Sequence, residues 1–190
     1  MRTKNFLSIA ALMICGLVCV INVKAEGTIS PAKTAEPVTV NIKLSPIQAI
    51  VVNAGQKTVD LEYTTITDYE QGVTKALANH LTVYSAGKFG VYVKTNGNFM
   101  NGSESIGARD VTVKATHSGH SVGTFTPVGL TTADQLLISS TSKGGNGLKY
   151  NIEYDNLDGK DFKYAGEAYY TAASGVLTYT AEVTYTILPD

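Results

Sequence analysis

Apolar and polar residues alternate along much of this chain, and the alternation is longest near the C-terminus. Between residues 177 and 187 every second side chain is apolar, and the positions between them carry threonines and one glutamate. Successive side chains of a β-strand point to opposite faces, so the pattern predicts one long strand with an apolar face and a polar face. The apolar face consists of Leu177, Tyr179, Ala181, Val183, Tyr185 and Ile187.

Shorter stretches with the same period occur throughout the chain after residue 37. Segments rich in Gly, Asn, Ser and Pro separate them, and no helical period is sustained. Residues 67–79 lack the alternation, and we expect a loop there or a single helical turn at residues 75–78. The predicted strands cover residues 38–44, 47–52, 58–63, 81–84, 89–93, 111–115, 136–138, 148–154 and 176–187.

Short alternating strands separated by turns predict an all-β fold, an immunoglobulin-like antiparallel β-sandwich of about 8–10 strands. The short connection at residues 85–88 predicts a hairpin between the strands on either side of it. Alternation assigns inward positions to Leu81, Val83, Tyr150 and Tyr154, and outward positions to His80, Tyr84 and Tyr92.

The first 25 residues predict a secretory signal peptide. Arg2 and Lys4 form a basic start, residues 6–21 are almost all apolar, and small residues precede a cleavage point after Ala25. The apolar run is short for a membrane span, which needs about 20 residues, so we expect no span after cleavage. We expect a flexible leader at residues 26–36 and one sandwich domain at residues 37–190. The expected location is the periplasm, cell surface or exterior of a bacterium.

Composition narrows the classes of function further. Cys15 and Cys19 are the only cysteines and lie in the predicted signal peptide, so the mature chain has no thiol for a disulfide, a metal site or a nucleophile. Three of the 15 basic residues and none of the 16 acidic ones lie there too, which leaves a net charge of about −4. Nucleic-acid binding needs clustered Lys and Arg, which this chain lacks.

Candidate catalytic and metal-binding residues are few. His117 and His120 have a spacing that suits a metal, but no carboxylate lies within several residues of them. Asp155, Asp158 and Asp161 lack the spacing of a calcium loop. No nucleophile motif with a matching base is present. The sequence therefore predicts a protein that is not an enzyme and that uses no metal and no cofactor.

Three passages occur in an order typical of one family. They are residues 59–63 followed by 69–73, residues 81–84 followed by 89–93 and Asn96-Gly97, and the closing stretch 175–187. With them the chain resembles the secreted pilin-type proteins of the chaperone–usher class, most closely the spore-coat-protein-U-like branch. The resemblance covers most of the chain after the signal peptide.

The resemblance implies a structural subunit of a pilus or coat whose sandwich is incomplete and accepts a strand from a neighbouring subunit. Its implied partners are like subunits and a periplasmic chaperone. The strand-exchange residues are Val38, Val40, Ile42 and Leu44 in the donor, and Leu177, Tyr179, Val183 and Tyr185 in the closing stretch. The residues alone leave a second interpretation open, in which 38–44 is the first strand of a self-complete sandwich.

A different function also fits the sequence. Exposed tyrosines provide contact area at low entropic cost, and they stack against sugars. The alternative prediction is therefore a monomeric secreted module that binds a carbohydrate or peptidoglycan, with Tyr92 and Tyr170 as candidate ligand contacts.

Overall fold

The computed structural model describes residues 33–166 and 175–190 of the chain. Contacts divide the chain into two compact units, Met1–Ile42 and Lys43–Asp190. Every helix and strand of the described residues lies in the second unit. The predicted signal peptide and Tyr170 lie outside the described residues.

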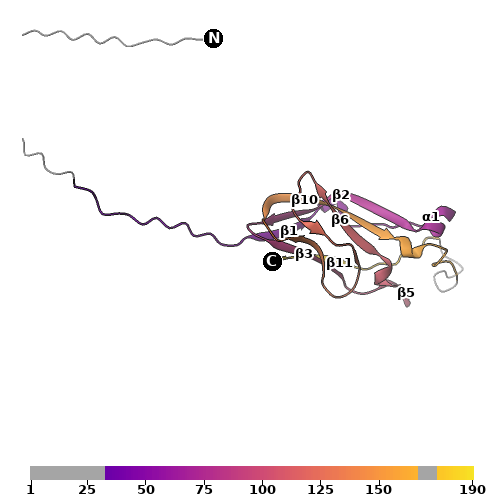
Figure 1. The fold of residues 1–190 in the computed structure, drawn as a ribbon. Helices are drawn as coiled ribbons and strands as arrows, with labels where there is room; N and C mark the ends of the chain where they lie inside the picture. Colours follow the sequence, from indigo (N-terminus) through magenta and orange to yellow (C-terminus); the bar gives the residue numbers. More distant parts are fainter. Residues whose placement is uncertain (1–32, 167–174) are drawn as a thin grey trace, which may run out of the picture. The chain divides into compact units, whose positions relative to one another are not determined.

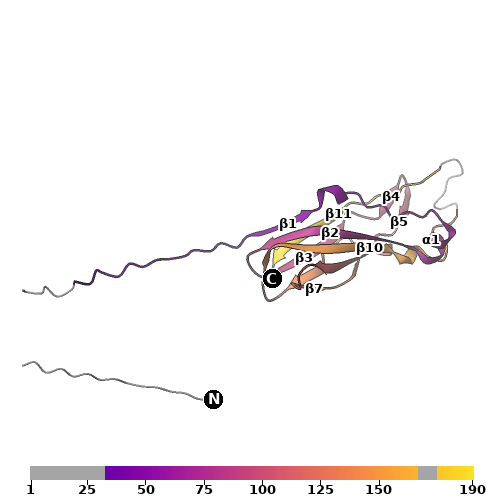
Figure 2. The same cartoon turned by 90° about the horizontal axis from the view of Figure 1, so that it is seen from above.

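Unit Lys43–Asp190 is a sandwich of two antiparallel sheets, which confirms the predicted fold class (Figures 1 and 2). The first sheet has the order β1 (Gln48–Val52), β2 (Val73–Ser85), β10 (Gly145–Asn156), β6 (Thr112–Ser118) and β8 (Val128–Gly129). The second has the order β11 (Val183–Pro189), β3 (Phe89–Thr95), β9 (Gln135–Ser140) and β7 (Thr124–Phe125). A separate small hairpin consists of β4 (Phe99–Asn101) and β5 (Glu104–Ile106).

The core lies between the two sheets and is made of the inward faces that alternation predicts. Leu81, Val83 and Tyr150 of the first sheet, and Phe89 and Val91 of the second, are fully buried. Alternation works here because each strand packs one face against the opposite sheet, and the other face contacts solvent. Each such aliphatic or aromatic side chain stabilises the fold by roughly 1.5–3 kcal/mol when it is buried.

Strands β2 and β3 do not form the predicted hairpin. β2 pairs with β1 and β10, whereas β3 pairs with β11 and β9 in the other sheet. The connection at residues 86–88 therefore crosses from one sheet to the other. Gln48 pairs with Ser85, and Pro189 pairs with Phe89, so the start of β1 and the end of β11 lie at the same end of the sandwich. Figures 1 and 2 show that end opposite α1.

Strand β2 begins earlier than predicted, because residues 75–78 belong to it and form no helical turn. The helix that precedes it, α1 (Ile66–Gln71), begins with a capping box between Thr65 and Asp68. At Asn79 φ is 52°, and the register between β2 and β10 shifts beside it, which marks a β-bulge. The bulge turns His80 inward to 2% exposure, so its predicted outward position is wrong.

Three predicted strands are absent or shorter in the structure. Residues 58–63 form no strand, and the closing strand begins only at Val183, because residues 175–182 contribute no more than a bridge between Thr180 and Met100. Residues 38–44 carry no regular secondary structure either. Side chains of the first two segments still alternate between half-buried and exposed. Apart from the bridge at Thr180, neither segment belongs to a sheet formed by the described residues.

Three short 3-10 helices complete the described elements. They are η1 (Ala54–Gln56), η2 (Ala108–Asp110) and η3 (Leu157–Gly159). η2 and η3 lie near α1, at the end of the sandwich where the candidate site is found.

Candidate functional site

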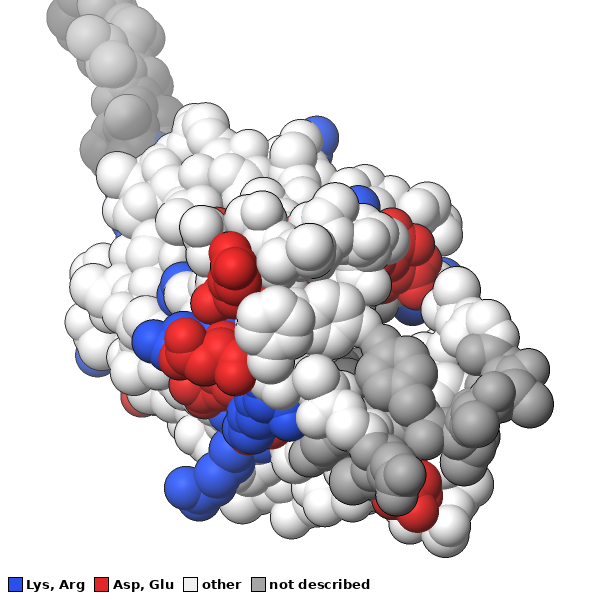
Figure 3. Space-filling model, turned by 90° about the vertical axis from the view of Figure 1, so that its right-hand side faces the viewer, with Lys and Arg blue, Asp and Glu red and all other residues white. Residues whose placement is uncertain are grey.

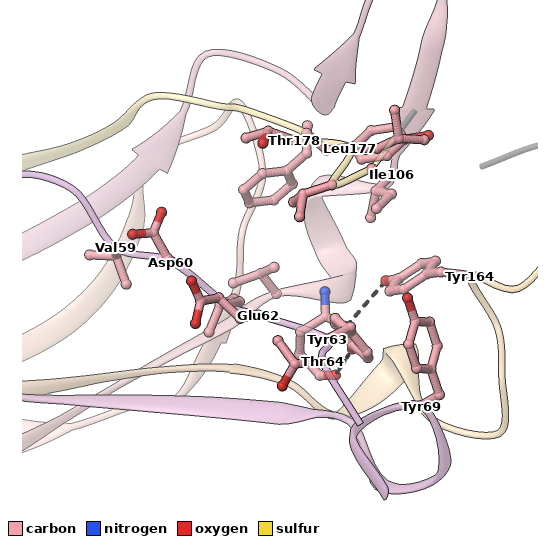
Figure 4. Close-up of a pocket in the computed structure, with 17 residues that line it drawn as sticks. Val59, Asp60, Glu62, Tyr63, Thr64, Tyr69, Ile106, Tyr164, Leu177 and Thr178 are labelled. Atoms are coloured by element: carbon pink, nitrogen blue, oxygen red, sulfur yellow. Dashed lines mark hydrogen bonds between the residues drawn. The ribbon is translucent and has the colours of Figure 1, made fainter. Parts of the chain in front are cut away.

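A groove of about 420 Å³ lies between the two extended segments that form no strand. Residues 59–64 form one wall and residues 175–179 the other, although they are more than 100 positions apart in the chain (Figure 4). Apolar side chains from both walls and from the core between them line it: Val59, Leu61, Tyr63, Phe99, Ile106, Val111, Leu177 and Tyr179. The groove therefore has an apolar lining, and both of its described walls are segments that belong to no strand.

Two carboxylates lie on the rim of this groove. Asp60 and Glu62 are exposed and alternate with the apolar lining residues of their segment. Figure 4 draws them on the wall opposite Leu177 and Thr178. None of the ion pairs within the described ranges involves either one. Figure 3 shows the α1 end of the molecule, where acidic and basic side chains form small mixed groups on a mainly uncharged surface.

One end of the groove is closed by hydrogen-bonded tyrosines. The Tyr63 hydroxyl donates to the backbone oxygen of Asn156 at 3.0 Å and lies 2.9 Å from its Oδ1. The Tyr164 hydroxyl donates to Asp110 Oδ2 at 2.9 Å. Burial raises the pKa of both phenols well above the usual 10.0. They therefore stay neutral and act as hydrogen-bond donors that fix the wall, not as acids or bases.

The chain continues from the groove wall at residues 175–179 into strand β11. β11 pairs with β3 on one side, and no strand of the described residues pairs with its other edge. Its inward side chains Val183, Tyr185 and Ile187 are half-buried and pack against the core. The Tyr185 and Tyr154 hydroxyls lie 2.6 Å apart and tie β11 to the opposite sheet, and burial raises the pKa of Tyr185 far above 10.0.

The predicted donor segment has the complementary property. Val38, Val40, Ile42 and Leu44 are between 82% and 89% exposed and belong to no strand. Four alternating apolar side chains in water are an unfavourable arrangement for an isolated chain, because each one gains free energy when it is buried.

The structure brings together some of the predicted site residues. Leu177 and Tyr179 lie in the groove wall, and Val183 and Tyr185 continue the same face along β11. Tyr92, a candidate sugar contact, lies on β3, half-buried, with its ring close to Gly90. Sequence reasoning missed the opposite wall as part of a site, although its period of two was visible in Val59 and Leu61.

The histidine pair has local partners instead of a metal set. His117 Nε2 lies 3.0 Å from the Gly123 oxygen, and His120 Nε2 lies 2.8 Å from the Lys149 oxygen. His120 Nδ1 accepts the Val122 N–H at 3.1 Å. Within residues 33–166 and 175–190, no three His, Cys, Asp or Glu side chains gather in a way that holds a metal ion.

No protein-family model matches the chain, and no curated protein matches it. Among the described residues, none of the helices has the length and apolar character needed to cross a membrane.

Proposed function

We propose that this protein is a non-enzymatic structural subunit, pilin-like or coat-like, that assembles by β-strand addition outside the cytoplasm. In this proposal residues 38–44 of one copy pair with the free edge of β11 of another, in continuation of the groove wall formed by residues 175–179. The observation that carries it is that one chain holds both an exposed alternating segment without a strand partner and an apolar groove beside an unpaired strand edge. Strand addition uses these two features together.

The magnitudes favour such an exchange. Burying two Val, one Ile and one Leu side chain contributes roughly 1.5–3 kcal/mol for each of them. Association costs about 4–15 kcal/mol in lost translational and rotational freedom, so the side chains alone offset much of that cost. Backbone hydrogen bonds along the free edge of β11 add to the binding energy.

The same features support the proposed partners. An unpaired strand edge next to apolar side chains pairs readily with any other edge, and it is an aggregation hazard until it is covered. A subunit that waits for assembly therefore benefits from a protein that covers the groove, which is the role we propose for a periplasmic chaperone. Like subunits replace that cover in the final assembly.

The test compares residues 26–190 with a truncated chain that lacks residues 26–44. Size-exclusion chromatography with light scattering measures the assembly, and thermal unfolding measures the stability. We expect polymers from the longer chain, and from the shorter one an unstable monomer that a peptide of residues 37–45 stabilises. A peptide with Val40→Asp and Ile42→Asp is the matched control.

The opposite result would reject strand exchange. If residues 26–190 are a monomer, and the truncated chain is equally stable and unaffected by the peptide, residues 38–44 have no role in completing a sandwich. The carbohydrate-binding alternative then becomes the next one to test, by retention on glycan columns with and without Tyr92→Ala.

A further inference from the structure

The hydrogen bonds of Glu182, the residue that precedes β11, show which peptide groups of the strand point to its free edge. The N–H of Glu182 donates to Asn96 Oδ1 at 3.0 Å, and its carbonyl accepts the Asn96 N–H at 3.0 Å. Both of its peptide groups thus face the β3 side. Successive residues of a strand direct these groups to opposite sides, so Val183, Tyr185 and Ile187 direct theirs to the free edge. An incoming strand therefore bonds to the residues whose side chains point inward.

We propose that the donor strand binds this edge in one antiparallel register, which is fixed by an ion pair between Lys43 of one copy and Glu182 of the next. This inference rests on the proposed function. In this register the donor side chains Leu44, Ile42, Val40 and Val38 lie opposite Ala181, Val183, Tyr185 and Ile187, respectively. Directly opposed residues share a face of a sheet, so all eight side chains point into the sandwich.

Several antiparallel registers place the apolar faces of the two strands together, and charge favours this one among them. Lys43 is the only charged residue between residues 37 and 45, and Glu182 is the only one on the outward face of residues 178–188. Both are exposed, and neither takes part in an ion pair of the described residues. A shift of two residues keeps the apolar faces together but moves Lys43 opposite Thr180 or Thr184. Opposite charges directly across a sheet stabilise the pairing modestly.

Coverage of the edge selects the antiparallel direction. A parallel strand also places Lys43 opposite Glu182, but its apolar residues then face positions 177–183 and leave most of β11 uncovered. The antiparallel strand covers Val183–Ile187, where the unpaired peptide groups lie.

Chain reach excludes the same copy as the source of this strand. The Ile47 carbonyl accepts the Ala86 N–H at 2.9 Å, which holds it at the end of the sandwich where Pro189 lies. Ala181 precedes Pro189 by eight residues, so it lies about 26 Å from Pro189 along the extended strand. Leu44 is three residues from Ile47, and such a segment spans at most about 11 Å. The occupant must therefore be a second copy.

The register also gives the assembly a direction. The donor leaves the acceptor beside Ala181, on the side of β11 that faces the α1 end of the sandwich, and it enters its own sandwich at the end that carries Pro189. Unlike ends of successive copies therefore meet. Such a head-to-tail contact differs from the self-complementary contact of a two-fold dimer, and it allows copies to add one after another into a filament.

Cysteine pairs test the register directly, because the chain from residue 26 has no cysteine. Thr39→Cys and Thr186→Cys together place two thiols at opposed positions that exchange no hydrogen bond, with Cα atoms about 4.5 Å apart, within the range for a disulfide. We expect covalent ladders from this variant after mild oxidation. Three controls combine Thr39→Cys with Thr184→Cys, Leu188→Cys or Thr178→Cys, which report the two shifted registers and the parallel strand.

Charge reversal tests the ion pair. We expect Lys43→Glu to raise the concentration for half-assembly about tenfold, and the double variant with Glu182→Lys to return it to within about twofold of wild type. The effect should vanish in 1 M salt, where the screening length is about 3 Å.

The outcomes separate the two proposals. Ladders that form best with a control pair, or an intramolecular disulfide, overturn the register, while polymers by light scattering keep the proposed function. Charge reversal without effect on assembly overturns the ion pair. Monomers from wild type, with no ladder from any pair, overturn the proposed function itself.

Discussion

Two Lys–Asp pairs in this protein differ in the burial of the acid, and that difference gives a quantitative prediction; Lys114 also pairs with the half-buried Glu153. Lys114 Nζ lies 2.5 Å from Asp155 Oδ2, and the Asp155 side chain is 6% exposed. Lys94 Nζ lies 3.2 Å from Asp134 Oδ1, and that acid is 51% exposed. The lysines themselves are similarly exposed, at 37% and 41%. Asp155 Oδ2 accepts no hydrogen bond from another described group, so Lys114 is its neutralising partner.

The substitution Lys114→Met keeps the aliphatic stem and removes the charge. Leaving a buried carboxylate unpaired costs about 3–5 kcal/mol when both partners are buried. Lys114 is partly exposed and water screens the pair, so we expect a loss of about 2 kcal/mol. Lys94→Met should cost at most about 0.5 kcal/mol, because water solvates Asp134 in either case.

Urea unfolding of wild type and both variants measures this difference at neutral pH, and the melting temperature should fall by about 4–8 °C for Lys114→Met. Hydrogen bonds to Asp155 and Glu153 raise the pKa of Lys114 above its usual 10.5. The stabilisation is thus fully present below pH 10.5 and is lost as the pH rises through the raised pKa. Equal losses in the two variants would show that the burial of Asp155 has no energetic consequence.

Three further predictions concern two buried polar side chains and the tight packing around Gly159. Burial lowers the pKa of His80 below 6.5, so the unfolded chain binds the proton more readily and stability should fall as the pH drops below 6.5. Urea midpoints measured from pH 7.5 to 5 should depend less on pH in His80→Gln than in wild type. Identical pH profiles of the two proteins would contradict this prediction. Tyr185→Phe leaves the Tyr154 hydroxyl without this partner and should lower the free energy of unfolding in urea by about 1–2 kcal/mol. The exposed control Tyr84→Phe should change stability little. Equal losses in the two variants would refute the reasoning. A Cβ on Gly159 would overlap the Tyr63 hydroxyl, so Gly159→Ala should lower stability by about 1–3 kcal/mol. Gly87→Ala, with open space around it, should be neutral in the same assay, and a loss as large as that of Gly159→Ala would disprove this account.

The sequence predicts the core of this fold well because burial acts on each strand locally. Leu81, Val83 and Tyr150 are fully buried as alternation predicts, since a period of two is all that a strand between two layers requires. The assignment of strands to sheets is different. Nothing in residues 85–88 distinguishes a hairpin from a connection that crosses between sheets, because both need only a short polar turn.

The bulge beside Asn79 explains the errors around β2. The φ of 52° at Asn79 and the shift of register beside it turn His80 inward, while Leu77 and Leu81 on either side keep the inward face that alternation predicts. His80 is therefore buried next to Leu81, where a strict period of two requires one of them to be exposed. A backbone conformation of this kind depends on the opposing strand, here on the hydrogen bond from the Asn79 N–H to Asn151 Oδ1, and the local sequence does not encode it.

The candidate groove shows what alternation does and does not report. Residues 58–63 and 176–182 have the period of a strand and its two-sided burial, but apart from the bridge at Thr180 they belong to no sheet of the described residues. A period of two records which side chains face the core, whereas a strand also needs a neighbour that supplies hydrogen bonds, and that neighbour need not belong to the same chain. Under the proposed function, the failure to predict these two segments is informative: their sequences fit a sheet that a second copy completes. Residues 38–44 carry the same pattern, and their chemistry matches that of the missing strand.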